Sequence, residues 1–241
     1  MPTGQTRRKR APRNSLTRDA ILQRTIGVLD EHGPGALTMR ALAEHLEVGP
    51  MALYTYFRSK DELLDAARDH ILRDLPAQPS EGDWTQRLRC VGLDLYRLLV
   101  SHPALIHLFA TRPLAGHEAA DATEAHLRVL REAGFDRVTA ARAHLALLHH
   151  VLGSATWDTQ LNDGREGDDS RSRRRNALRA MSADRYPTLV DLATELVTDA
   201  VGEEQFKFGL ELILTGLRAR LDQQDTQDVG HTVTYSEALT P

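Results

Sequence analysis

The chain has 241 residues, 41% of them hydrophobic and 5% aromatic, which suffices for a core filled mainly by Leu and Ala, in one large domain or in a small and a larger one. It shows no clear runs of alternating β-branched residues, so an all-α fold is predicted. Its single cysteine, Cys90, excludes a disulfide framework and a thiolate metal cluster.

The charges are distributed unevenly along the chain. The formal net charge is −4, but residues 1–18 hold six of the 30 basic residues and none of the 34 acidic ones, which leaves −10 for the remainder. A basic arm on an acidic body is typical of a protein that engages a polyanion at one end only.

Residues 1–16 are predicted to be a disordered basic arm, because Pro, Gly, Arg and Asn follow one another there without periodicity. The arm could neutralise DNA phosphates or enter the minor groove, or it could be a solvated tail, and both interpretations stay open. No apolar region follows it, so a secretory signal is not predicted. No uncharged apolar stretch approaches the ~20 residues of a membrane span, and we expect a cytoplasmic protein without membrane contact.

A first helix is predicted from Thr17 to His32, and a helix-turn-helix follows between Leu37 and Lys60. Thr38 can cap the first helix of that motif, and Ala43 provides the small side chain that two short crossing helices need. Glu47 stands at a turn position that is often left-handed, where a non-glycine residue costs about 1 kcal/mol.

The second helix of the motif is predicted over residues 51–57. Its exposed set contains no acid and two phenol hydroxyls, which suits contact with DNA bases and phosphates. The set consists of Pro50, Met51, Tyr54, Thr55 and Tyr56. A tight helical corner without a ligand is the alternative interpretation.

Residues 17–75 are expected to form the DNA-binding domain, which ends with a helix that begins at a Ser59–Glu62 capping box. After a linker, residues 83–223 are expected to form a second, helical domain and residues 224–241 a disordered tail. Apolar periodicity predicts its helices at 83–101, 103–111, 116–133, 136–161 and 203–223. Residues 162–170 are predicted to be a polar loop, and the arginines at 171, 173, 174 and 175 a solvated helix face rather than a second DNA site.

The run Leu53-Tyr54-Thr55-Tyr56-Phe57, with Lys60 after it, matches without gaps a Leu-Tyr-x-(His/Tyr)-(Phe/Val)-x-x-Lys pattern. With Leu37-Thr38-Met39-Arg40, Ala43, Ala52 and Glu62-Leu63-Leu64, it resembles the DNA-binding domain of the tetracycline-repressor (TetR) family over about the first 70 residues. A weaker resemblance to the ligand-binding domain of tetracycline repressors follows at Ser101-His102, at Thr111-Arg112-Pro113 and from Phe208 to Leu217.

The resemblance implies an N-terminal three-helix helix-turn-helix domain and a larger C-terminal helical domain for ligand binding and dimerisation. It implies contacts with base edges from Arg40, Pro50, Met51, Thr55 and Tyr56, and with phosphates from Thr38, Tyr54 and Lys60. A recognition helix of only about seven residues reads few base pairs, so we expect a homodimer on a near-palindromic double-stranded DNA operator.

Glycines inside the last predicted helix point to a close helix contact. Gly209 and Gly216 lie two turns apart, and each costs about 1 kcal/mol relative to Ala, so another helix is expected to approach them closely. In the family this helix and the long one form a four-helix dimer interface, for which we expect Gly209, Ile213, Gly216 and Leu217. Close packing within one chain is the alternative.

The resemblance also implies an effector pocket for a small molecule. Candidates that combine an apolar wall with a few polar groups are Leu105, His107, Leu108, His149, His150, Thr156 and Trp157. In tetracycline repressors a His before Thr-Arg-Pro helps to bind a metal; here Leu108 takes that place and His107 is one residue off, which argues against tetracycline. His144, His149 and His150 could also suggest a metal site, but the neighbours His149 and His150 point about 100° apart on a helix. A metal site is therefore not predicted, and no cofactor is expected.

No nucleophile elbow, HExxH, P-loop or dinucleotide fingerprint occurs, so an enzyme is not expected. The resemblance implies a repressor that binds an effector and then leaves its operator. The effector would favour a dimer whose two recognition helices no longer match the spacing of the DNA grooves. Two alternatives stay open. One is a helical small-molecule-binding protein or enzyme with an incidental N-terminal domain, and the other is an architectural DNA binder whose affinity follows charge.

Overall fold

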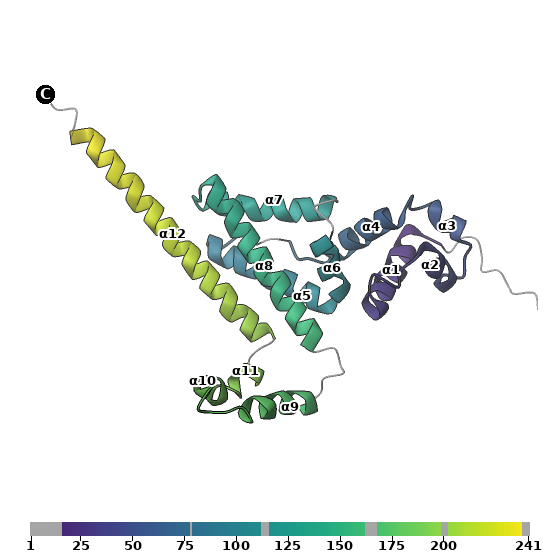
Figure 1. Ribbon diagram of the computed structural model, residues 1–241. Helices are drawn as coiled ribbons and strands as arrows, with labels where there is room; N and C mark the ends of the chain where they lie inside the picture. The colour runs from purple at the N-terminus through teal and green to yellow at the C-terminus, as the bar shows by residue number, and fades with distance from the viewer. Residues whose placement is uncertain (1–15, 78, 112–115, 162–167, 199–201, 238–241) are drawn as a thin grey trace, which may run out of the picture. The chain divides into compact units, whose positions relative to one another are not determined.

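The protein is an all-helical chain in the computed structural model (Figure 1). The structure describes residues 16–77, 79–111, 116–161, 168–198 and 202–237. Every regular element in those ranges is an α-helix, which confirms the predicted fold class. Within the same ranges no helix is both long and apolar enough to cross a membrane. The predicted basic arm, apart from Leu16, lies outside the described residues.

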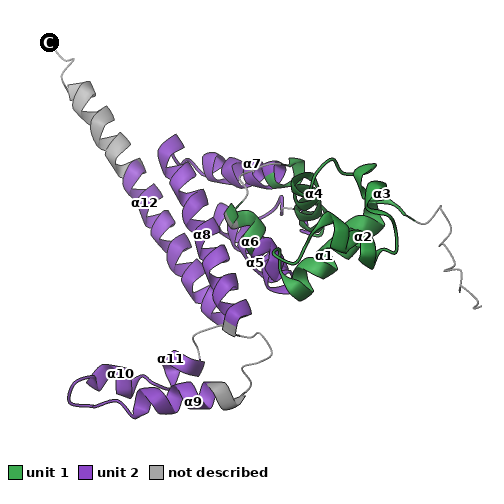
Figure 2. Cartoon of the chain, turned by 45° about the vertical axis from the view of Figure 1, so that its right-hand side comes forward, with its two compact units in different colours: residues 1–74, 107–119 green, residues 75–106, 120–241 purple. Residues whose placement is uncertain are grey.

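The chain separates into two compact units (Figure 2). Unit 1 comprises residues 1–74 and 107–119, and unit 2 comprises residues 75–106 and 120–241. Unit 1 contains α1 (Arg18–His32), α2 (Met39–His45), α3 (Pro50–Tyr54) and α4 (Lys60–Leu72). Unit 2 contains α5 (Trp84–Ser101), α8 (Arg137–Leu161), α9 (Asp168–Arg179), α10 (Pro187–Asp191), α11 (Glu195–Thr198) and α12 (Glu203–Glu237). The helices α6 (Pro103–Thr111) and α7 (His117–Glu132) contribute residues to both units.

Three side-chain caps set where the helices of unit 1 begin. The hydroxyl oxygens of Thr17, Thr38 and Ser59 accept hydrogen bonds of 3.0–3.1 Å from the backbone N–H groups of the third residue after each. Such a cap satisfies one of the four orphan N–H groups of a helix start and contributes typically ~1 kcal/mol. The three helix starts predicted from the sequence are therefore confirmed.

The helix-turn-helix is built around a small apolar core. Leu42, Ala43, Leu53 and Phe57 are completely buried, and Glu47 in the connecting turn has φ 55°, the left-handed conformation that the sequence predicts. α3 ends at Tyr54, three residues earlier than predicted. Phe57 still turns inward, because its N–H donates to the carbonyl of Leu53 at 3.0 Å.

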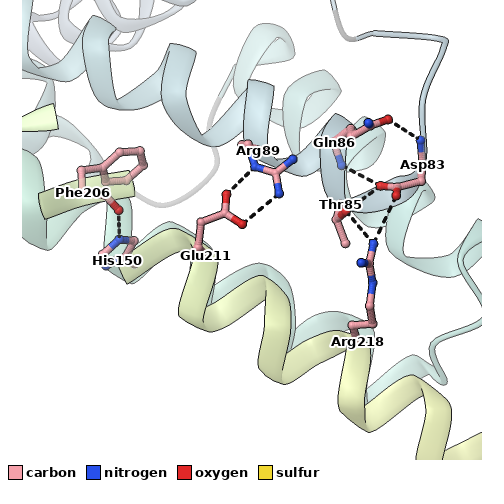
Figure 3. A network of polar contacts seen from close by, with 8 residues as sticks. All are labelled: Asp83, Thr85, Gln86, Arg89, His150, Phe206, Glu211 and Arg218. Atoms are coloured by element: carbon pink, nitrogen blue, oxygen red, sulfur yellow. Dashed lines mark hydrogen bonds and ion pairs between the residues drawn. The ribbon is translucent and has the colours of Figure 1, made fainter. Parts of the chain in front are cut away.

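α8 packs against both α5 and α12 in unit 2 (Figures 1 and 2). Polar contacts join α5 to α12 along the outside of this apolar packing (Figure 3). Arg89 makes two hydrogen bonds to Glu211, and Arg218 donates to Thr85 at 2.9 Å and to the α5 cap Asp83 at 3.2 Å. The capping box that Asp83 forms with Gln86 is confirmed. These pairs fix the register of the two helices more than they add stability, because they are partly solvated.

Two helix boundaries in unit 2 differ from the prediction. α9 begins at Asp168, inside the predicted loop 162–170. α12 continues to Glu237, past the predicted end at about residue 223, since no proline interrupts that stretch. The sequence predicts a disordered tail from residue 224, whereas the structure assigns residues 224–237 to this helix.

A pair of histidines joins α7 to α8. Nδ1 of His126 lies 2.7 Å from Nδ1 of His144, and His126 is buried. One neutral imidazole must donate and the other accept across this contact. Burial, with His144 as a second cause, lowers the pKa of His126 to about 4, and burial also lowers the pKa of His144.

The histidine pair predicts acid sensitivity of unit 2. The unfolded imidazoles titrate near pH 6.5, so the stability that the neutral pair provides is complete above that pH and is lost as the pH falls toward about 4. Between pH 7.5 and pH 5, we expect the free energy of unfolding to fall by about 2 kcal/mol more in the wild type than in His126→Gln. Urea unfolding at both pH values measures this, with exposed His149→Gln as the control. Parallel losses in wild type and His126→Gln would contradict it.

Candidate DNA-binding surface and ligand cavity

α3 exposes an acid-free surface. Met51 is 76% exposed and Tyr54 45%, while Pro50 and Thr55 are also exposed. Pro50 occupies the first turn of α3, where its missing N–H costs little. The exposed side chains offer apolar contact and hydroxyl groups, which match the base edges and phosphates of a major groove.

Two other predicted DNA contacts lie at the N-terminal end of α2, where Thr38 is the N-cap. The Oγ1 of Thr38 accepts the capping hydrogen bond from Ala41, which leaves the hydroxyl hydrogen available to a phosphate oxygen. The side chain of Arg40 is 84% exposed, and its Nε lies 3.2 Å from the carboxylate of Glu44. An exposed pair of this kind contributes little stability, so Arg40 can exchange Glu44 for a base or a phosphate at small cost.

Tyr56 and Lys60 are held differently from what the sequence predicts. Tyr56 is half-buried, and its hydroxyl donates to the carbonyl of Leu16 at 2.6 Å. Lys60 is also half-buried, and its Nζ donates to the carbonyl of Pro34 at 3.2 Å. Both polar groups therefore make hydrogen bonds within unit 1, and DNA would have to compete with a backbone carbonyl for each of them.

Unit 2 contains a cavity of about 740 Å³, whose walls come from α8, α9, α11 and the start of α12. The lining residues are His149, His150, Gly153, Ser154, Trp157, Asp158, Arg174, Leu196, Gly202, Gln205 and Phe206. Three of the predicted pocket residues are among them, namely His149, His150 and Trp157.

The other four predicted pocket residues do not line this cavity. Leu105 and Leu108 are buried, and His107 is exposed. The hydroxyl of Thr156 donates to the backbone of Leu152 in its own helix. A signal for some of the missed residues does exist in the sequence, since His150, Ser154 and Asp158 recur every fourth residue and place polar groups on one face of α8.

Asp158 is a buried carboxylate at the wall of the cavity. Its Oδ2 accepts a hydrogen bond from the hydroxyl of Tyr96, and its Oδ1 accepts one of 2.9 Å from the N–H of Gly202. Both oxygens are thus satisfied, as a buried charge requires. Burial, followed by the hydrogen bond to Asp158, raises the pKa of Tyr96 well above its usual value, so the phenol stays a donor.

An aromatic stack supports the same wall. The ring of Phe206 lies between Tyr96, with centroids 4.3 Å apart, and His150, with centroids 5.1 Å apart. Nε2 of His150 also lies 3.0 Å from the carbonyl oxygen of Phe206 (Figure 3). No cluster of three or more His, Cys, Asp or Glu side chains that could hold a metal occurs among the described residues.

The arrangement of an N-terminal helix-turn-helix and a helical unit with a cavity agrees with two family models. The model of bacterial regulatory proteins of the tetR family matches residues 21–67, and that of the tetracyclin repressor-like C-terminal domain matches residues 75–221. The chain belongs to the TetR family. It is therefore a DNA-binding transcriptional regulator.

TetR-family relatives resemble the chain over most of its length. The class C tetracycline repressor of Escherichia coli is 32% identical, over 89% of this chain and 96% of the relative. The structure of ActR from Streptomyces coelicolor in complex with actinorhodin aligns with a TM-score of 0.73 and 29% identity, covering 88% of this chain and 99% of that one. BioQ bound to its double-stranded DNA operator aligns with a TM-score of 0.58 and 26% identity, covering 85% and 99%.

α8 and α12 carry exposed apolar side chains. Val138 and Leu145 on α8 and Phe208 and Leu212 on α12 are exposed. Of the residues predicted for a dimer interface, Gly216 is exposed with open space around it, and Ile213 is half-buried. Leu217 is buried within the chain's own core, so its side chain is not available to a partner.

Gly209, also predicted for the dimer interface, is a point of close packing within the chain. A Cβ there would overlap Cε1 of His150 and lie 2.9 Å from its Nε2. The imidazole cannot move away cheaply, because it stacks on Phe206 and lies within hydrogen-bond distance of that residue's carbonyl. The predicted close approach of another helix is therefore made by α8 of the same protomer.

We expect Gly209→Ala and Gly153→Ala to change stability in opposite directions. Alanine favours a helix by about 1 kcal/mol over glycine, and a Cβ at Gly153 meets nothing within 4 Å. Gly153→Ala should therefore stabilise the protein, while overpacking costing about 1–3 kcal/mol should make Gly209→Ala destabilising. Chemical denaturation of both variants measures this. Equal stabilisation by the two substitutions would contradict the role given to Gly209.

Proposed function

We propose that this TetR-family regulator is a repressor that binds a near-palindromic double-stranded operator as a homodimer and is released by a small-molecule effector. The acid-free surface of α3, with Met51 and Tyr54 exposed, carries the DNA-binding part of the proposal. A five-residue helix reads few base pairs, so specificity requires two copies. BioQ in complex with its operator supports DNA binding, and ActR in complex with actinorhodin supports effector binding.

The direct DNA contacts are proposed residue by residue. Pro50, Met51 and Thr55 would reach base edges, and Tyr54 would reach phosphate. Arg40 of α2 would contact a base, and the N-cap Thr38 a phosphate. Tyr56 and Lys60 are given a supporting role, because their polar groups already bind the backbone of the same unit.

The last turns of α4 offer a route by which the effector signal could reach the DNA-binding helices. Asp69 of α4 accepts a hydrogen bond from the backbone of His117, at the start of α7. Arg73 lies 3.0 Å from the carboxylate of Glu118 in the same turn of α7. These residues belong to unit 1, whereas the rest of α7 belongs to unit 2. A change in α7 would therefore act directly on α4, and an effector would shift the population toward a dimer that fits the operator poorly.

The proposal is tested by fluorescence anisotropy with labelled DNA from upstream of the protein's own gene. A specific repressor should bind this DNA with a dimer stoichiometry, resist unrelated competitor DNA, and dissociate when an effector found by thermal-shift screening is added. Affinity that follows salt concentration but not sequence would indicate an architectural DNA binder. Absence of binding at low salt would leave a helical small-molecule-binding protein or enzyme. The proposed role is that of a cytoplasmic regulator without catalytic activity.

A further inference from the structure

The cavity of unit 2 has an aromatic wall that is open to a ligand. Trp157 lines it and is nevertheless 64% exposed. A large exposed aromatic side chain in a concave site is unusual for a protein surface and typical of a binding site. The faces of Phe206 are already covered by Tyr96 and His150. The indole of Trp157 is therefore the ring that offers a stacking surface to a planar ligand.

One wall of the cavity comes from a strongly basic helix. α9 carries arginines at 171, 173, 174, 175 and 179, against acids only at 168 and 169, and Arg174 lines the cavity. Among the described lining residues, Asp158 has the only carboxyl group, and hydrogen bonds from Tyr96 and Gly202 satisfy both of its oxygens. The basic cluster of α9, which looks like a solvated helix face in the sequence, thus places a guanidinium at a ligand site.

We infer that the cavity binds a planar aromatic carboxylate, with the ring system against Trp157 and the carboxylate on the guanidinium of Arg174. A guanidinium and a carboxylate form two parallel charge-assisted hydrogen bonds. A volume of about 740 Å³ lies within the usual range of small-molecule sites and accommodates two or three fused rings. The inference rests on the proposed function, since it names the chemical class of the effector.

Direct binding tests the inference without DNA. Trp84→Phe leaves Trp157 as the only tryptophan of the two, and anthracene absorbs where tryptophan emits, so a bound anthracene quenches Trp157. We expect anthracene-2-carboxylate to quench saturably and to bind at least about tenfold more tightly than the neutral anthracene-2-carboxamide. That difference corresponds to one charge-assisted pair.

Two arginine variants separate a specific contact from general charge. Arg174→Gln should lower the affinity for anthracene-2-carboxylate at least about tenfold and leave the affinity for the carboxamide unchanged. Arg173→Gln removes the same charge from a residue that does not line the cavity and should leave both affinities within about twofold. Equal binding of the two compounds, equal effects of the two variants, or no quenching of Trp157 would overturn the inference. Operator binding by the same protein, measured separately, would then show that the proposed repressor function survives.

Discussion

Met51→Glu should reduce operator affinity by at least about 100-fold without lowering the stability of the protein. Met51 is the most exposed large hydrophobic side chain of α3 and takes no part in the apolar core. A carboxylate in its place would face the phosphates and the acceptor-rich base edges of the groove. A dimer presents the substitution twice, so about 1.5 kcal/mol per half-site suffices for the expected loss.

Met181→Glu is the matched control, because it makes the same change at an exposed methionine outside the helix-turn-helix. Anisotropy titrations of both variants against the operator, with thermal unfolding of each, measure the two effects. If Met51→Glu bound as tightly as Met181→Glu, α3 would not be the DNA-reading element. If it unfolded at a clearly lower temperature, the loss of binding could not be assigned to a contact.

Leu212→Asp should convert the proposed dimer into monomers and abolish operator binding at nanomolar protein concentration. Leu212 is 60% exposed on α12, next to Phe208 and the open Gly216, so the substitution does not enter the protomer core. In a dimer the carboxylate would be buried against an apolar partner surface. The desolvation cost amounts to several kcal/mol for an unpaired charge, and the two-fold interface contains it twice.

Leu192→Asp introduces the same charge at another exposed leucine, at the end of α10, and should leave the protein dimeric. Sedimentation velocity over a concentration series gives the oligomeric state, and anisotropy gives the affinity for DNA. A dimer that persisted in Leu212→Asp, with Leu192→Asp behaving alike, would show that the exposed apolar face of α8 and α12 is not the interface. The proposal for DNA recognition by α3 would be unaffected by that result.

Much of the fold can be predicted from the sequence because its determinants are local. Thr17, Thr38 and Ser59 lie beside the N–H groups that they cap, and the Asp83–Gln86 box spans a single turn. The strained turn at Glu47 is also a local property. Helix starts, the helix-turn-helix and the exposed positions of α3 therefore follow from short-range patterns.

The candidate site follows much less from the sequence, because residues far apart in the chain decide it. The hydroxyl of Tyr56 donates to the carbonyl of Leu16, 40 residues away in the chain. The space beside Gly209 is filled by the ring of His150 from another helix. Helical periodicity says which residues share a face, but not which face receives a partner.

Composition, caps and apolar spacing by themselves determined that this is an all-helical chain with a helix-turn-helix at its N-terminal end. Only the tertiary structure decided that α9 and α11 close a cavity against α8 and α12, and that Leu217 packs inward while Leu212 stays exposed. The physical reason is the range of the interactions. Hydrogen bonds of caps and turns form within a few residues, whereas cavities and exposed faces arise when distant helices exclude water from one another.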